Sequence, residues 1–131
     1  MAYSLLESST DLTAHCPVLI VEDDADLREM MAQLLTLEGF KAVTASNGRE
    51  ALQYLCDGEP PEVILLDLMM PVMDGWEFRR RQQADPHLAR VPVIVLSALD
   101  QVRANGLHPE AFLKKPLDFD RLLELVRQYC H

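Results

Sequence analysis

The chain has 131 residues, a length that fits one domain with a single hydrophobic core. Its formal net charge of −9 argues against binding nucleic acid or an anionic membrane by charge alone. No stretch approaches the roughly 20 apolar residues of a membrane span, and the N-terminus lacks the basic start and apolar block of a signal peptide. We therefore expect a soluble, cytoplasmic protein with no direct binding to nucleic acid or membrane.

The three cysteines Cys16, Cys56 and Cys130 are far apart in sequence and form no CxxC pair. An odd number with no metal-ligand spacing is typical of a reducing compartment, where thiols act as small apolar side chains. Residues 1–16 are rich in serine and threonine. We expect them to form a flexible extension to a single domain that spans residues 17–131.

Five short runs of apolar or β-branched residues predict five strands. In chain order the predicted strands are Val18–Val21, Phe40–Thr44, Val63–Leu66, Val91–Leu96 and Ala111–Lys114. The first and third runs are apolar at consecutive positions. This is typical of strands that are buried on both faces of a parallel sheet.

Helical patterns lie between the predicted strands. Apolar residues recur at helical spacing from Leu27 to Leu35, and Gly39 closes that helix. The N-caps expected for later helices are Ser46 or Asn47, then Asp74 with capping-box spacing to Glu77, and finally Asp118. Such alternation predicts an α/β fold, a doubly wound five-stranded parallel sheet with helices on both faces.

Polar side chains stand at the carboxyl ends of four predicted strands. They are Glu22 and Asp23 after the first strand, Asp67 at the end of the third, Ser97 after the fourth and Lys115 after the fifth. Open α/β sheets keep their ligand sites at this edge. Carboxylates that meet there repel one another unless a cation lies among them, so we predict a Mg²⁺ site. The simpler alternative is that each acid only caps the helix that follows it.

This set of groups suits phosphoryl transfer, which needs mainly positioning and charge neutralisation. Asp67 would act as the nucleophile and form an acyl phosphate. Ser97 and Lys115 would then hold the phosphoryl oxygens by hydrogen bond and charge. Taken singly, Ser97 is most simply a turn residue and Lys115 a solvated loop residue, so the prediction depends on their combination.

The motifs VLIVEDD, LLDLMMPVMDG, VIVLSA and FLKKP resemble those of the receiver domain of two-component response regulators. The similarity runs from about Val18 to Tyr129. Asp67 lies 44 positions after Asp23 and 30 before Ser97, spacings that are usual for the family. The resemblance implies a flavodoxin-like (βα)5 receiver fold with Asp67 as the phosphoacceptor.

The resemblance also implies roles for the surrounding residues. Its Mg²⁺ ligands are Glu22, Asp23, Asp67 and the backbone carbonyl of Met69. Lys115 would bind the phosphate, Ser97 would be the switch hydroxyl and Phe112 the switch aromatic. The family typically has a cis peptide bond before the proline, which here is the bond from Lys115 to Pro116.

Two features depart from the family pattern. Only 18 positions separate Ser97 from Lys115, fewer than is usual, and we therefore expect a shortened fourth helix and a displaced output surface. The third helix carries an arginine run, Arg79–Arg81. This run is either a solvated face or a docking patch for a partner.

The resemblance implies a signalling domain rather than a conventional enzyme. It would accept a phosphoryl group on Asp67 from a histidine kinase or a histidine phosphotransfer protein, hydrolyse it slowly, and switch binding to a downstream protein. The chain would be a stand-alone receiver or a part of a longer regulator. One alternative is a receiver-like interaction module that works without phosphorylation. An aspartate-dependent phosphatase is disfavoured, because such enzymes typically carry a second acid where Met69 stands.

Overall fold

The computed structural model describes residues 16–98 and 107–130 of the chain. Residues 1–15 of the expected N-terminal extension lie outside the described residues. So does most of the segment in which the shortened fourth helix is expected, residues 99–106.

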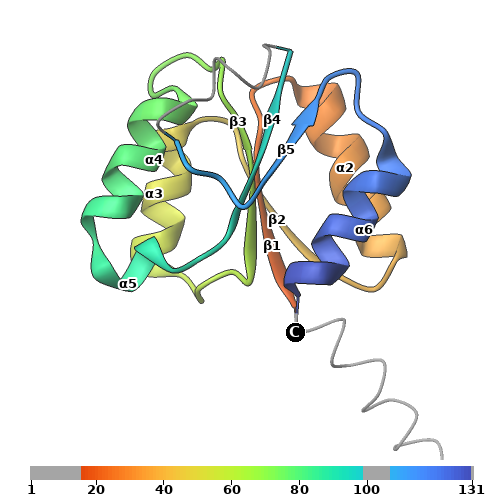
Figure 1. Cartoon of the computed structure of the whole chain (residues 1–131), viewed down its shortest axis with the longest axis horizontal. Helices are drawn as coiled ribbons and strands as arrows, with labels where there is room; N and C mark the ends of the chain where they lie inside the picture. The colour runs from red at the N-terminus through yellow and green to blue at the C-terminus, as the bar shows by residue number, and fades with distance from the viewer. Residues whose placement is uncertain (1–15, 99–106, 131) are drawn as a thin grey trace, which may run out of the picture.

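Five parallel strands form one sheet in the order β2-β1-β3-β4-β5 (Figure 1). The strands are β1 (Pro17–Val21), β2 (Lys41–Ala45), β3 (Val63–Asp67), β4 (Val93–Ser97) and β5 (Ala111–Lys114). All four neighbouring pairs are parallel. The predicted doubly wound sheet is therefore confirmed, and the carboxyl ends of its strands share one edge.

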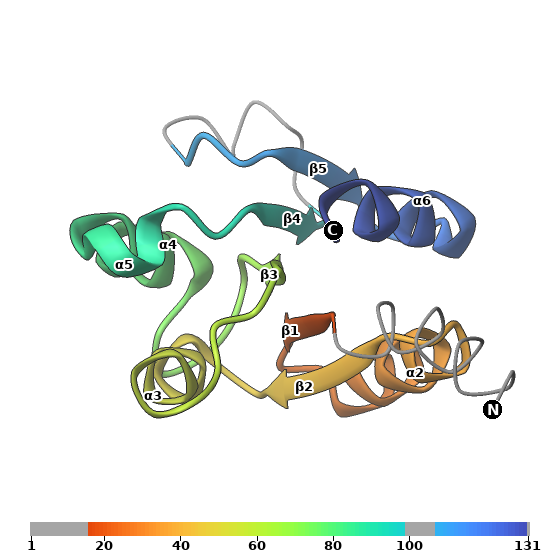
Figure 2. The same cartoon turned by 90° about the horizontal axis from the view of Figure 1, so that it is seen from below.

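Helices cover both faces of the sheet. They are α2 (Ala25–Leu37), α3 (Gly48–Asp57), α4 (Gly75–Ala84), α5 (Pro86–Ala89) and α6 (Phe119–Tyr129). Figures 1 and 2 show α2 and α6 on one face and α3, α4 and α5 on the other. The four-residue α5 was not predicted, because it is too short to show a helical pattern. Within the described parts of the chain, no helix is long and apolar enough to span a bilayer.

Side-chain caps fix where the helices begin. The side chain of Asn47, rather than that of Ser46, accepts a hydrogen bond at the start of α3. Asp74 caps α4 and Asp118 caps α6, as predicted. The capping box of α4 is only half formed, because the Glu77 carboxylate pairs with two arginines of its own helix.

The strand side chains alternate between two hydrophobic cores. Along β1, Val18 and Ile20 pack under α2 and α6, whereas Leu19 and Val21 pack under α3 and α4. The strands β1, β3 and β4 are buried along their whole length. Consecutive apolar residues in these strands thus pack on opposite faces of the sheet. Because both faces are buried, apolar and polar residues do not alternate along these strands.

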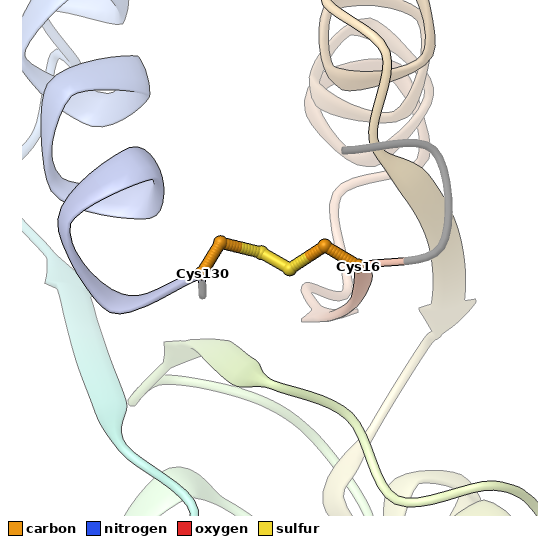
Figure 3. Close-up of a disulfide and its surroundings, with 2 residues drawn as sticks. All are labelled: Cys16 and Cys130. Carbon is orange, nitrogen blue, oxygen red and sulfur yellow. A yellow bond between two sulfur atoms is a disulfide. The ribbon is translucent and has the colours of Figure 1, made fainter. Parts of the chain in front are cut away.

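The sequence predicted three separate thiols, and the structure shows that this prediction is wrong. Cys16 and Cys130 form a disulfide, with their Cα atoms 6.1 Å apart, whereas Cys56 is free and exposed (Figure 3). Because helices run antiparallel to strands in this fold, α6 ends at the edge of the sheet where β1 begins. Sequence spacing hid this contact, since 114 positions separate the two residues.

Candidate functional site

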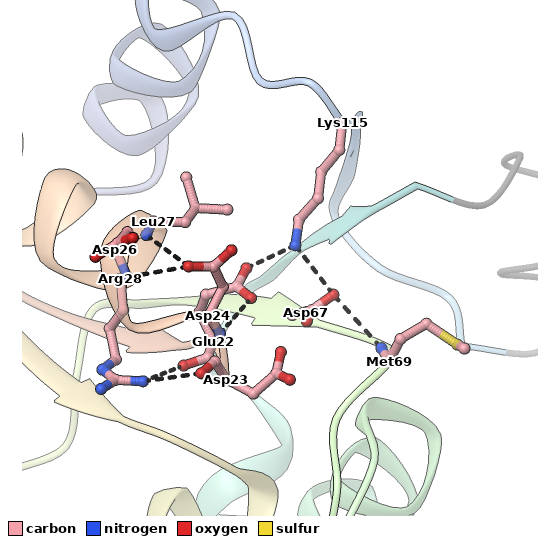
Figure 4. A network of polar contacts seen from close by, with 9 residues as sticks. All are labelled: Glu22, Asp23, Asp24, Asp26, Leu27, Arg28, Asp67, Met69 and Lys115. Atoms are coloured by element: carbon pink, nitrogen blue, oxygen red, sulfur yellow. Dashed lines mark hydrogen bonds and ion pairs between the residues drawn. The ribbon is translucent and has the colours of Figure 1, made fainter.

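Three carboxylates and an ammonium group meet at the carboxyl edge of the sheet (Figure 4). Lys115 Nζ lies 2.8 Å from Glu22 Oε1 and 3.5 Å from Asp67 Oδ1. Carboxylate oxygens of Glu22, Asp23 and Asp67 all lie within 4.8 Å of one another. The structure therefore brings together residues that stand after β1, at the end of β3 and after β5.

Asp67 occupies an environment that disfavours its ionised form. Its side chain is 4% exposed. Burial, and then the negative charge of Glu22, raise the pKa of Asp67 to about 7, although Lys115 opposes the shift. A cation that offset this repulsion would favour the carboxylate, which is the form that can act as a nucleophile.

Lys115 remains charged although it is partly buried. Burial alone would lower its pKa, but the hydrogen bond that Lys115 donates to Glu22 and the charge of Asp67 outweigh that effect and raise the pKa of Lys115. The ammonium group is thus a permanent positive charge beside the two buried acids. It neutralises only part of their negative charge.

The loop after β3 holds Asp67 against the start of α4. Gly75 N donates a hydrogen bond to Leu68 O at 2.9 Å, and Met69 N donates to Asp67 Oδ1 at 3.4 Å. A Cβ atom on Gly75 would lie 2.6 Å from the backbone oxygen of Asp67, which is too close for any other residue. Gly75 therefore permits the close approach of α4 to the end of β3.

A basic residue of α2 holds the turn that carries the acidic pair. Arg28 Nη1 donates hydrogen bonds to Glu22 O at 2.8 Å and to Asp23 O at 3.4 Å. The sequence did not reveal this role. The available signal was an arginine in the first turn of a helix, where the helix dipole disfavours positive charge. We conclude that Arg28 positions the backbone from which both carboxylates project.

The remaining predicted residues lie at or near the same edge. Ser97 is fully buried at the end of β4, and its backbone carbonyl accepts a hydrogen bond from Lys115 N at 2.8 Å. Phe112 is partly buried and packs against the core under α3 and α4. The Met69 side chain is exposed, and the role of its backbone carbonyl as a Mg²⁺ ligand stays a prediction. The peptide bond before Pro116 is cis, as expected from the resemblance.

Comparison with known proteins identifies the family. The family model for the response regulator receiver domain matches residues 18–127 of this chain. The chain belongs to this family. Its fold agrees with solved receivers, among them the receiver domain of a histidine kinase from Syntrophus aciditrophicus, with a TM-score of 0.82 and 31% identity over 88% of this chain and 90% of that one.

Two further receiver structures carry information about the site. The response regulator TrrA from Thermotoga maritima, solved in complex with Mg²⁺ and BeF, has a TM-score of 0.78 and 27% identity over 88% of this chain and 99% of that one. The phosphorylated cyanobacterial phytochrome response regulator RcpA has a TM-score of 0.72 and 28% identity, and the match covers 87% of this chain and 90% of that one.

Curated relatives differ in how much of their length this receiver covers. A 14.6 kDa protein of Leptolyngbya boryana is 36% identical over 89% of this chain and 92% of its own length. The regulatory protein AtoC of Escherichia coli is also 36% identical over 89% of this chain, but the match covers only 26% of AtoC. The chain thus spans about a quarter to a half of the longer regulators that it matches.

The arginine run of this receiver divides into one buried and two exposed residues. Arg79 is 4% exposed and donates to Leu107 O at 2.9 Å, to His108 O at 2.8 Å and to Gln82 Oε1 at 2.8 Å. Arg80 and Arg81 are exposed and both pair with Glu77. Arg79 therefore fits neither interpretation of the run, because it ties α4 to the segment before β5. The ion pairs with Glu77 offset part of the charge that a docking patch would offer.

The raised pKa of Asp67 predicts how the stability of this receiver depends on pH. Between pH 3.8, the ordinary pKa, and about 7, the folded protein keeps a proton that the unfolded chain has lost. The free energy of unfolding should therefore fall as the pH rises through this window, by on the order of 4 kcal/mol without Mg²⁺. Urea unfolding of the wild type and Asp67→Asn at several pH values measures the difference between them.

The difference in free energy of unfolding between the two proteins isolates the contribution of Asp67, because all other acids titrate in both proteins. Asp67→Asn should lack this fall, and saturating Mg²⁺ should reduce it in the wild type. If the free energy of unfolding of the two proteins changed with pH in the same way without Mg²⁺, the pKa of Asp67 would not be raised by its surroundings.

Proposed function

We propose that this receiver accepts a phosphoryl group on Asp67, with Mg²⁺ bound beside it, from a histidine kinase or a histidine phosphotransfer protein. The observation that carries the proposal is the placement of the buried Asp67 carboxylate, 3.5 Å from the Lys115 ammonium and grouped with the oxygens of Glu22 and Asp23. Structural capping alone does not explain this cluster, because the Asp67 side chain caps no helix among those described.

The donor set fits Mg²⁺. This ion prefers one or a few carboxylates and keeps water or phosphate oxygens as its remaining ligands. Glu22, Asp23 and Asp67 would hold it together with the backbone carbonyl of Met69. When bound, Mg²⁺ would neutralise charge on the acids and on an incoming phosphoryl group.

The chain's own residues then account for the transfer. An Oδ atom of Asp67 attacks phosphorus while the bond between phosphorus and the donor's imidazole nitrogen breaks. Lys115 exchanges its contact with Glu22 for one with a phosphoryl oxygen, and the Ser97 hydroxyl donates to another. Slow attack by water on the acyl phosphate restores Asp67. The protein therefore acts as a signalling domain that modifies itself, not as an enzyme for outside substrates.

Two relatives support this assignment. TrrA was solved with Mg²⁺ and BeF, and RcpA was solved in its phosphorylated state. Both belong to the family shown for this chain. We infer that this receiver binds Mg²⁺ and takes up a phosphoryl group in the same way.

A groove beside the site offers a partner access to Asp67. It has a volume of about 370 Å³ and lies between the start of α2 and the loop that leads into α6. Met30 and Phe119 supply apolar surface, and Lys115 forms part of its wall. We propose that the phosphodonor protein docks at this groove in the cytoplasm. The phosphorylated form then binds a downstream protein rather than nucleic acid or membrane.

Loss of Asp23 is expected to weaken Mg²⁺ binding by roughly tenfold or more, because its carboxylate is one of the three in the cluster. Isothermal titration calorimetry of Asp23→Ala and the wild type measures this change. Asp26→Ala is the matched control, since it removes an exposed acid from the first turn of α2, outside the cluster. The control should bind Mg²⁺ within about twofold of the wild type. Equal affinities in Asp23→Ala and the wild type would contradict the metal assignment.

A further inference from the structure

The disulfide lies at the opposite edge of the sheet from the phosphoacceptor. Figure 1 shows that β1 begins close to the end of α6, and Cys16 and Cys130 join these two elements there. The five residues of β1 separate Cys16 from Glu22, a distance of about 15 to 20 Å along a strand. The bond is therefore remote from the groups that would hold Mg²⁺ and phosphate.

Both cysteines are held in place by contacts other than their own bond. Cys16 is 4% exposed, and its backbone carbonyl accepts a hydrogen bond from Lys41 N at 3.1 Å. Near Cys130, the last turn of α6 is held by an ion pair from Arg127 to Glu38 and by a hydrogen bond from the Tyr129 hydroxyl to Glu110 O at 3.2 Å. The two sulfur atoms should thus remain neighbours when the bond is broken. The Cα atoms of Cys16 and Cys130 are 6.1 Å apart, which lies within the range that disulfides adopt.

We propose that Cys16 and Cys130 form a reversible redox site, which is a dithiol under reducing conditions and a disulfide under oxidising ones. This proposal goes beyond phosphoryl acceptance and does not depend on it. Disulfides rarely persist in a reducing compartment, and those that occur there respond to changes in redox state. A preorganised pair of thiols at the start of β1 and the end of α6 suits such a response.

A small-molecule disulfide, such as oxidised glutathione, would serve as the oxidant. Cys130 is partly exposed and Cys16 is buried, so the thiolate of Cys130 would attack first, forming a mixed disulfide and releasing one glutathione thiol. The thiolate of Cys16 would then attack the sulfur of Cys130 and release the second thiol. Two electrons and two protons pass from the cysteines to the oxidant, and excess reduced glutathione reverses both steps.

Oxidation would stabilise the fold without changing the phosphoacceptor site. The bond closes a loop across 114 positions of the chain, which restricts the unfolded state strongly. For a domain of this size we expect the Tm to rise by about 10 °C. The rate of phosphorylation by acetyl phosphate should stay within about twofold between the two redox states, because the bond lies at the other edge of the sheet.

Equilibration of the full chain in graded mixtures of reduced and oxidised glutathione tests the proposal. Thiol titration after denaturation should count all three cysteines in reducing mixtures and only Cys56 in oxidising ones. Thermal unfolding of the same samples should show the rise in Tm on oxidation. Non-reducing electrophoresis should show a monomer throughout, since the bond is within one chain.

Variants separate this pair from the third cysteine. Cys56→Ser should keep the rise in Tm on oxidation, and Cys130→Ser should lose it. If Cys130→Ser does not fold, the comparison of reduced and oxidised wild type still decides the question. Three free thiols in every mixture, a bond that includes Cys56, or equal Tm values in the two states would each overturn the proposal.

Discussion

In Asp67→Asn, phosphorylation by acetyl phosphate with Mg²⁺ is expected to fall below detection. The amide keeps the shape of the side chain but lacks the anionic oxygen that attacks phosphorus. The variant should remain folded, because it removes a buried negative charge that lies beside Glu22 and thereby relieves repulsion. Intact mass spectrometry measures the outcome as the gain or absence of one phosphoryl group.

Asp57→Asn provides the matched control for this experiment. Asp57 is an exposed acid at the end of α3. Its substitution makes the same change of carboxylate to amide, but away from the site. The control should be phosphorylated at the rate of the wild type. A phosphoryl group of undiminished yield on Asp67→Asn would place the acceptor at another residue.

Arg79→Leu is expected to lower the free energy of unfolding by about 3 kcal/mol. The substitution leaves the carbonyl oxygens of Leu107 and His108 and the Gln82 side chain without the hydrogen bonds that the guanidinium donates. Leucine supplies apolar volume at this buried position but no donor. Urea unfolding of the variant and the wild type gives the difference.

The neighbouring Arg80→Leu makes the same substitution on the exposed side of α4. It removes an ion pair with Glu77 that solvent screens, so its effect should stay within about 1 kcal/mol. Similar losses in the two variants would mean that the hydrogen bonds of Arg79 contribute little. The buried guanidinium would then have no special part in holding residues 107–110 against α4.

Much of the fold could be predicted because the strands are short, apolar and regularly spaced. The run that ends at Asp67 and the proline after Lys115 locate strand ends, and in a parallel sheet strand ends of the same kind share an edge. This geometric rule brings Glu22, Asp67 and Lys115 together before any distance is known. Cap residues such as Asp118 fix helix starts for an equally local reason.

The features that could not be predicted depend on contacts between residues distant in sequence. Arg79 and His108 meet only because α4 packs beside the segment before β5, and nothing in the arginine run distinguishes its buried member from its exposed ones. The pairing of Cys16 with Cys130 likewise follows from the arrangement of the first strand and last helix. Arg28 was missed because its partners are backbone carbonyls, and only its place in the first turn of a helix pointed to a role.

Trapping of the acyl phosphate tests the assignment of Asp67 most directly. The protein is treated with acetyl phosphate and Mg²⁺ and then with borohydride, which reduces an aspartyl phosphate to homoserine, and peptide mass spectrometry locates the altered residue. We expect homoserine at position 67, and none when Mg²⁺ is replaced by a chelator. Reduction at a different aspartate, or no reduction in a protein shown to be folded and to bind Mg²⁺, would contradict it and favour a receiver-like module that works without phosphorylation.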